Sequence, residues 1–203
     1  MAQRAQRLID AAKNSPLPEG TYAVGAGLLV AGLAAYGFQI LTFRQLDESQ
    51  YAALNGLWIL IFIVTPGLFQ PLEQEVARSL AHRNSQGRGG APLVKKAALL
   101  GGAFSVLAII VTLIVSPALI NSLFKGDSAL LIGLLISIVA YYVMFLTRGT
   151  LSGNGRFGTY GLLNGSEGGV RIAFVIALVI LGASTPGPYG IALALPPLFA
   201  VGI

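Results

Sequence analysis

Long stretches without a charged side chain alternate with short polar breaks along most of the chain. Four charge-free stretches cover residues 21–43, 49–72, 97–124 and 128–147. A membrane core about 30 Å thick needs about 20 helical residues, so each stretch predicts a spanning helix. A fifth apolar stretch covers residues 157–182 but contains Glu167 and Arg171. A sixth begins near Tyr189 and stops at Ile203. We therefore expect about six transmembrane helices, the last of them truncated.

The breaks between these stretches consist mainly of charged residues, glycine, proline, serine and asparagine. They cover residues 44–48, 84–90, 125–127, 151–155 and 184–188. Such residues favour turns because they tolerate unusual backbone angles or hydrogen-bond their own backbone. The alternation predicts an all-α fold, a polytopic membrane helix bundle that occupies residues 21–203.

Composition strengthens the membrane prediction. Hydrophobic residues make up 55% of the chain, glycine adds 26 residues, and charged residues make up only 10%. An ordinary soluble domain has about 25% charged residues. So few charges cannot cover a soluble surface of this size, which excludes a soluble enzyme, a disordered protein and a nucleic-acid binder. With no cysteine and one histidine, His82, we expect no metal site, no cofactor and no enzymatic activity.

Positive charge is distributed unevenly between the two ends of the predicted spans. With the N-terminus in the cytoplasm, ten of the 13 Lys and Arg residues lie in cytoplasmic segments, and only Arg44 and Lys125 lie in outer turns. The positive-inside rule therefore predicts a cytoplasmic N-terminus. Residues 1–20 then form a basic cytoplasmic segment, either an amphipathic helix on anionic lipid or an unstructured tail.

The fifth apolar stretch carries polar residues on one predicted helical face. At 100° per residue, Tyr160, Asn164, Glu167 and Arg171 fall within about 60° of arc. Glu167 and Arg171 are four residues apart, close enough for an ion pair. Two interpretations are open: this face lines a hydrated cavity that meets cargo, or the pair is a neutral structural contact between helices.

Small residues mark a second face of the same stretch. Gly161, Gly165 and Gly169 recur every four residues, a pattern that lets membrane helices approach closely. We expect them to pack against a neighbouring helix and to bind nothing.

The second stretch contains two prolines and a charged end. Pro66 and Pro71 each remove a backbone donor and predict a kinked or loosened helix. The apolar pattern continues beyond them, so the helix is expected to extend past the membrane. Here Glu73 or Glu75 lines a cytoplasmic gate, or the segment is a solvated helix end with a Glu75–Arg78 pair.

Three stretches of sequence together resemble a known family. They are residues 32–54, residues 65–78 (TPGLFQPLEQEVAR), and residues 148–171, which contain RGTLSGNGRF, Tyr160, Glu167 and Arg171. In this order they resemble the N-terminal lobe of polysaccharide and lipid-linked oligosaccharide flippases of the multidrug/oligosaccharidyl-lipid/polysaccharide exporter superfamily. With the six-helix pattern, the resemblance covers nearly all of residues 21–203.

This resemblance implies one lobe of a two-lobed transporter in the bacterial cytoplasmic membrane. Such proteins work by alternating access, and the implied cargo is a polyprenyl-pyrophosphate-linked glycan. The implied cavity residues are Glu73, Arg148, Asn164, Glu167 and Arg171. Arginine suits pyrophosphate because its planar fork binds two oxygens at once. The implied partners are membrane lipid, the glycan lipid, and a second lobe or another copy of this chain.

Two other functions remain open from the sequence. A cation-coupled multidrug exporter of the same superfamily would favour acidic groups and apolar walls, and Arg171 argues against it. A non-transporting membrane scaffold subunit would need no cargo site at all.

Overall fold

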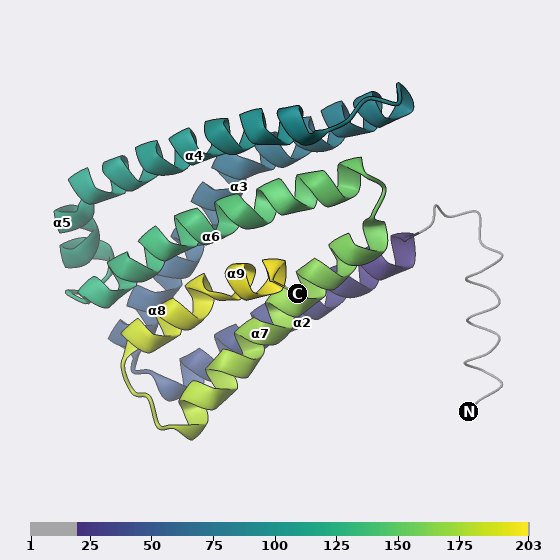
Figure 1. Cartoon of the computed structure of the whole chain (residues 1–203). Coiled ribbons are helices and arrows are strands. Elements are labelled where there is room, and N and C mark those ends of the chain that lie inside the picture. The colour runs from purple at the N-terminus through teal and green to yellow at the C-terminus, as the bar shows by residue number, and fades with distance from the viewer. Residues whose placement is uncertain (1–19, 203) are drawn as a thin grey trace, which may run out of the picture.

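The computed structural model describes residues 20–202, and these residues are helical apart from short connections (Figure 1). Five helices are long and apolar enough to cross a membrane. They are α2 (Thr21–Gln45), α3 (Glu48–Ser85), α4 (Ala91–Ile114), α6 (Ser128–Gly153) and α7 (Phe157–Ile180). The predicted all-α class is confirmed, and five such helices suit a multi-pass membrane protein. The predicted basic segment 1–20 lies outside the described residues except for Gly20.

The sixth predicted span is not one long helix. It forms α8 (Pro186–Ala194) and α9 (Pro196–Val201), which start three residues earlier than the expected Tyr189. Pro196 and Pro197 lack the N–H groups that would continue the ladder of α8. Together the two helices span about 24 Å if placed end to end, less than a membrane core. The number of full spans in the described residues is therefore five.

The third predicted span is also divided. Its long helix, α4, begins at Ala91 and ends at Ile114, after which come the short α5 (Ser116–Ala118) and the π-helix η1 (Leu119–Leu123). Pro117 sits in the first turn of α5, where its missing N–H costs no internal hydrogen bond. A charge-free stretch therefore predicts the length of an apolar segment, but it does not predict where the helices within it begin and end.

Polar residues form the turns where the sequence predicts them. Asp47 accepts a hydrogen bond from the Gln50 backbone N–H at 2.9 Å, and the Gln50 side chain accepts one from Asp47 N–H, a capping box that starts α3. Asp127 caps α6 through the N–H of Ala129 at 2.8 Å. The preceding Gly126 has a φ of 91°, which glycine adopts without strain.

α3 runs without interruption through Pro66 and Pro71 to Ser85. Its 38 residues span about 57 Å, far more than a membrane core, so its charged end extends beyond the apolar layer as expected.

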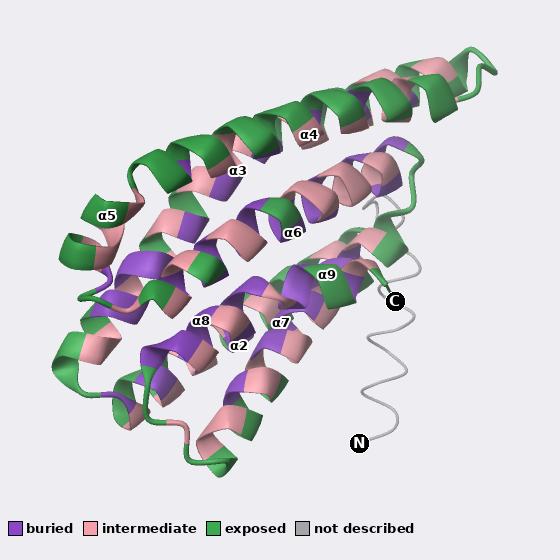
Figure 2. Cartoon of the chain, turned by 60° about the vertical axis from the view of Figure 1, so that its left-hand side comes forward, coloured by how far each residue is buried: buried purple, intermediate pink, exposed green. Residues whose placement is uncertain are grey.

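Two helix pairs organise the bundle. α2 packs along α7, and α3 packs along α6, with α4 covering α3 and α6 (Figure 1). Residue numbers rise together within each pair. Gly161 and Gly168 of α7 meet Ala23 and Ala31 of α2, and Gly149 and Gly153 of α6 meet Glu73 and Ala77 of α3. Both pairs are therefore parallel. α6 has the largest buried share of the long helices and lies inside the bundle (Figure 2).

Small residues bring α2 and α7 together, with one correction to the predicted stripe. A Cβ on Gly161 would come within 2.2 Å of the Ala23 carbonyl oxygen, and a Cβ on Gly168 within 2.7 Å of the Ala31 Cα. Gly169, which was expected to pack, has no atom within 4 Å of such a Cβ. The packing stripe is Gly161, Gly165 and Gly168, since a 3.6-residue period drifts away from strict steps of four.

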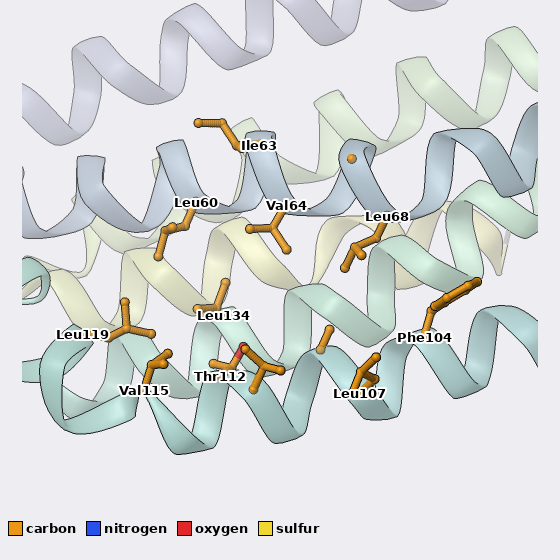
Figure 3. Close-up of a pocket in the computed structure, with 13 residues that line it drawn as sticks. Leu60, Ile63, Val64, Leu68, Phe104, Leu107, Thr112, Val115, Leu119 and Leu134 are labelled. Carbon is orange, nitrogen blue, oxygen red and sulfur yellow. The ribbon is translucent and has the colours of Figure 1, made fainter.

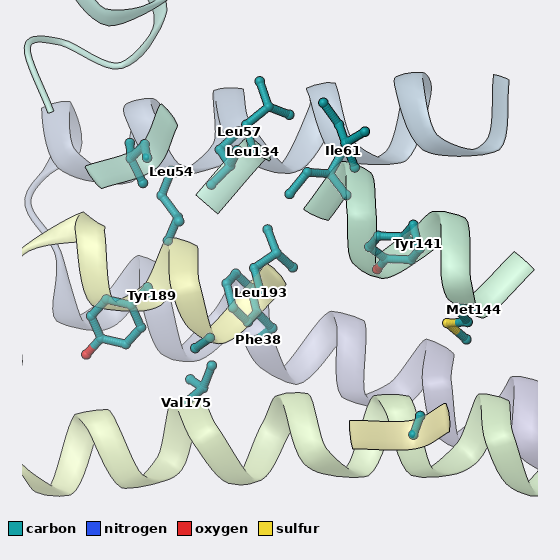
Figure 4. Packing of buried hydrophobic residues seen from close by; sticks show 14 of the residues in the cluster. Phe38, Leu54, Leu57, Ile61, Leu134, Tyr141, Met144, Val175, Tyr189 and Leu193 are labelled. Atoms are coloured by element: carbon teal, nitrogen blue, oxygen red, sulfur yellow. The ribbon is translucent and has the colours of Figure 1, made fainter. Parts of the chain in front are cut away.

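The core joins the two pairs through α8. Tyr189 and Leu193 of α8 are fully buried, as are Phe38 of α2, Leu57 of α3 and Val175 of α7 (Figure 4). α7 contacts α6 and α3 less than it contacts α8 and α9 taken together, and α8 and α9 also pack against α6. We call the boundary between α7 and the α3–α6 pair the seam. α8 and α9 fill much of it, and polar side chains bridge the rest.

Candidate functional site

The first polar cluster joins three helices near the ends of α3 and α6 and the start of α7. It consists of Glu73, Arg148 and Tyr160. Arg148 Nε lies 3.3 Å from Glu73 Oε2, and the Tyr160 hydroxyl donates to Glu73 Oε1 at 3.0 Å. Arg148 Nη2 in turn donates to the Tyr160 hydroxyl at 2.7 Å. Each group contacts the other two, so the sequence candidates Glu73 and Arg148 do come together.

Two glycines of α6 place this cluster. A Cβ on Gly149 would come within 2.7 Å of the Glu73 carbonyl oxygen, and a Cβ on Gly153 within 2.8 Å of the Ala77 carbonyl oxygen. α3 and α6 therefore approach backbone to backbone at this end. The close approach brings Arg148, next to Gly149, within reach of Glu73.

Arg148 keeps part of its binding capacity. Its guanidinium lies 5.0 Å from the Phe145 ring centre and 5.1 Å from the Tyr160 ring centre, within the range of cation–π contacts. The hydrogen bonds it makes within the described residues use Nε and Nη2, so Nη1 remains for a ligand or water. The side chain is 20% exposed, and that of Glu73 is 12% exposed. Both charged side chains of this cluster are therefore partly exposed.

The second polar cluster lies deeper and consists of Tyr141, Glu167 and Arg171. Arg171 Nη2 donates to Glu167 Oε1, which forms the i,i+4 ion pair, and also donates to the Tyr141 hydroxyl at 3.2 Å. The Tyr141 hydroxyl donates to Glu167 Oε1 at 3.2 Å. Glu167 is 4% exposed and Arg171 is 3% exposed. The burial of this pair favours the structural interpretation for this conformation.

Aromatic rings of α3 complete the second cluster. The Arg171 guanidinium lies 5.6 Å from the ring centres of both Trp58 and Phe62. Its Nε is buried and has no hydrogen-bond partner among the described residues. The arginine is thus held mainly by π faces and by one carboxylate oxygen.

The two clusters repeat the same residue types two helical turns apart. Tyr141 and Arg148 of α6 are seven residues apart, as are Tyr160 and Glu167 of α7. Seven residues correspond to about 10 Å along each helix. Each cluster pairs one arginine with one glutamate and one bridging tyrosine, so each is formally neutral.

Asn164 lies between the clusters on α7 but belongs to neither. It is buried, and its Nδ2 donates to the Tyr160 carbonyl oxygen of its own helix at 2.8 Å. This local bond occupies one of its two amide hydrogens.

Glu75, the other acid of the predicted gate, lies elsewhere. It forms an exposed pair with Arg78, with Oε2 2.9 Å from Nη2, and accepts a hydrogen bond from Ser79. The predicted Glu75–Arg78 pair exists, and Glu73 alone faces the seam.

The sequence interpretation missed three members of the site: Tyr141, Trp58 and Phe62. Tyr141 could have been found, because it lies two turns before Arg148 on the same predicted helical face. Trp58 and Phe62 gave no such signal, since aromatic residues at helical spacing are ordinary core residues.

Within residues 20–202, no group of three His, Cys, Asp or Glu residues could hold a metal ion. What the arrangement offers chemically is arginine donors for an anion, backed by aromatic rings. No protein-family model, curated protein or solved structure matches the chain.

Proposed function

We propose that this chain is one lobe of a transporter that moves a lipid-linked saccharide across a bacterial cytoplasmic membrane. The observation that carries the proposal is the partly exposed Arg148, which keeps Nη1 for an anion at the entrance of a seam that holds a second arginine. A pyrophosphate suits such a site because two oxygens can engage one guanidinium.

The first step of binding follows from the first cluster. Glu73 neutralises Arg148 when no cargo is present. An entering pyrophosphate oxygen binds Nη1 and competes with Glu73 for the guanidinium, while Tyr160 changes from bridging both groups to supporting the arginine. Between binding events, the pairing with Glu73 lowers the free-energy cost of keeping the Arg148 charge away from water.

The proposed orientation places the first cluster at the cytoplasmic side. The basic connection between α3 and α4 lies at the same end as the start of α2 (Figure 1), and the positive-inside rule assigns that end to the cytoplasm. In this arrangement α8 and α9 begin a sixth span. A second lobe or another copy of this chain supplies the opposite cavity wall, and rocking between lobes gives alternating access.

Binding of a fluorescent polyprenyl-pyrophosphate disaccharide to the purified chain in nanodiscs tests the proposal. Arg148→Gln should weaken binding at least tenfold, because a hydrogen bond to a charged group contributes about 1.5–3 kcal/mol. Arg148→Lys should bind with intermediate strength. Arg78→Gln is the matched control, since Arg78 is an exposed arginine on α3 outside the cluster. Equal loss in the Arg148 and Arg78 variants would refute the assignment.

A scaffold without cargo is the second candidate, and the second cluster favours it. Its two charges are buried and form an ion pair with each other. A drug exporter differs in its charge dependence: efflux of a lipophilic cation should then need Glu73 or Glu167 and tolerate loss of Arg148 and Arg171.

A further inference from the structure

An apolar groove between α3 and α4 lies away from both polar clusters. It has a volume of about 510 Å³ and reaches inward to η1 and α6. Figure 3 shows Leu60, Val64 and Leu68 of α3 pointing toward Leu107 and Thr112 of α4. The threonine is its one polar lining residue. None of the five site candidates lines it.

The lining of the groove changes from apolar to polar residues at Gly67. This glycine also lines an adjoining hollow of about 380 Å³ whose other walls are Pro66, Gln70, Pro71 and Gln74. Gln70 and Gln74 are exposed, and the hollow lies along α3 toward its charged end. One continuous surface is therefore apolar at one end and bears amide groups at the other, which is the polarity of a lipid.

The polar end of this surface lies beside positive charge. On α4, Lys96 precedes Leu100, Phe104 and Leu107 at spacings of four, four and three residues, so it shares the face that borders the groove. Ala97, the next residue, packs with Val76 of α3, which is two residues beyond Gln74. No acidic residue occurs between Glu75 and Asp127, whereas residues 79–96 contain Arg83, Arg88, Lys95 and Lys96; Arg78 is paired with Glu75.

We propose that this surface binds an anionic phospholipid of the leaflet at the α3–α4 connection. One acyl chain occupies the apolar groove, and the amides of Gln70 and Gln74 together with Lys96 receive the phosphate. The flanks of the groove support a lipid occupant, because Ile63, Leu100 and Leu107 are each at least 57% exposed and would meet water unless lipid covers them. The charge near the amides selects an anionic headgroup over a zwitterionic one.

Native mass spectrometry of the delipidated chain, titrated with phosphatidylglycerol or phosphatidylcholine, tests this site. Gly67→Leu should weaken phosphatidylglycerol binding at least tenfold by blocking the junction. No atom lies within 4 Å of a Cβ at Gly67, so the change adds bulk to the groove without a clash in the fold. Gly32→Leu on α2 is the matched control, because Gly32 is equally open and distant from the groove.

The charge is tested by two neighbouring lysines. Lys96→Gln should weaken phosphatidylglycerol about fivefold and leave phosphatidylcholine unchanged, since one lysine near the surface contributes about that factor for anionic lipid. Lys95→Gln removes the same charge from a face about 100° away and should have a smaller effect. These two variants change exposed side chains only, so they test the site even if Gly67→Leu does not fold.

Four results would overturn the proposal. Gly67→Leu and Gly32→Leu could weaken phosphatidylglycerol binding equally. Lys96→Gln and Lys95→Gln could also weaken it equally. A polyprenyl phosphate could displace phosphatidylglycerol at lower concentration, which would assign the groove to cargo. If Gly67→Leu removes a dimer peak from the mass spectrum and leaves the number of bound lipids unchanged, the groove binds a second copy of the chain instead.

Discussion

Removing one partner of the buried Glu167–Arg171 pair should destabilise the protein far more than removing both. Glu167→Leu leaves the Arg171 guanidinium buried beside two aromatic rings with only the Tyr141 hydroxyl as partner. Arg171→Met leaves the Glu167 carboxylate with Tyr141 alone. The double variant leaves no charge in the second cluster and fills the space with apolar groups.

The magnitude follows from the burial of both groups. Breaking a buried ion pair by removing one partner costs about 3–5 kcal/mol, whereas replacing both partners by apolar residues is often neutral. At 4% and 3% exposure, Glu167 and Arg171 qualify as such a pair. The double variant should therefore lie within about 1–2 kcal/mol of the wild type, giving a coupling energy of several kcal/mol in a double-mutant cycle.

Steric trapping in bicelles measures the free energy of unfolding for all four proteins in the cycle. The matched control is the same cycle on Glu75 and Arg78, whose side chains are 56% and 77% exposed and whose coupling should be much smaller. Additive losses at Glu167 and Arg171 would show that the two side chains do not stabilise each other. The cycle also separates functions: a stable double variant that keeps its cellular role supports a scaffold, and one that loses cargo transport supports a flippase.

Three further predictions concern the fold. Gly161→Leu should lower the free energy of unfolding by about 2 kcal/mol or more, because a Cβ at this position meets the Ala23 backbone. Gly169→Leu should be tolerated, because nothing lies within 4 Å of a Cβ there. Steric trapping compares the two variants, and equal losses of unfolding free energy would contradict the parallel α2–α7 contact. Asp47→Ala should cost about 1 kcal/mol through loss of the α3 cap, read from the same unfolding free energy, and no loss would argue against the capping box. Tyr189→Phe should cost about 1 kcal/mol by removing the hydroxyl bond to the Ala183 carbonyl, and hydrogen exchange should rise at the start of α8; unchanged exchange would contradict this role.

The sequence predicts the spans well because charge-free length is a local property. Residues 21–43 become α2 and residues 157–182 become α7 with ends shifted by a few positions. Prolines explain the failures. Pro117 and Pro196 each lie in the first turn of a new short helix inside apolar sequence. Hydrophobicity alone does not show where a backbone N–H donor is missing, so it does not predict these helix ends.

The candidate site is only partly a local property. The polar face of α7 follows from its 100° spacing, and so does the Glu167–Arg171 pair. The partners from other helices do not: Glu73 lies 87 residues from Tyr160, and their hydrogen bond depends on the glycine contacts that set the distance between α3 and α6. Packing geometry, rather than any pattern along one helix, decides which acid meets which arginine.

Under the proposed function the two clusters have different roles, because the first is partly exposed and the second is buried. In the proposed mechanism an anion exchanges with Glu73 at Arg148 while α3 and α6 stay in contact, because the Arg148 side chain is already 20% exposed. Reaching Arg171 requires α7 to separate from Trp58 and Phe62, since these rings lie against the buried guanidinium. Direct contact along the seam is sparse, and α8 and α9 hold it from one end. The proposed mechanism therefore has binding at Arg148 precede opening of the seam, with the second cluster setting the free energy that opening must overcome.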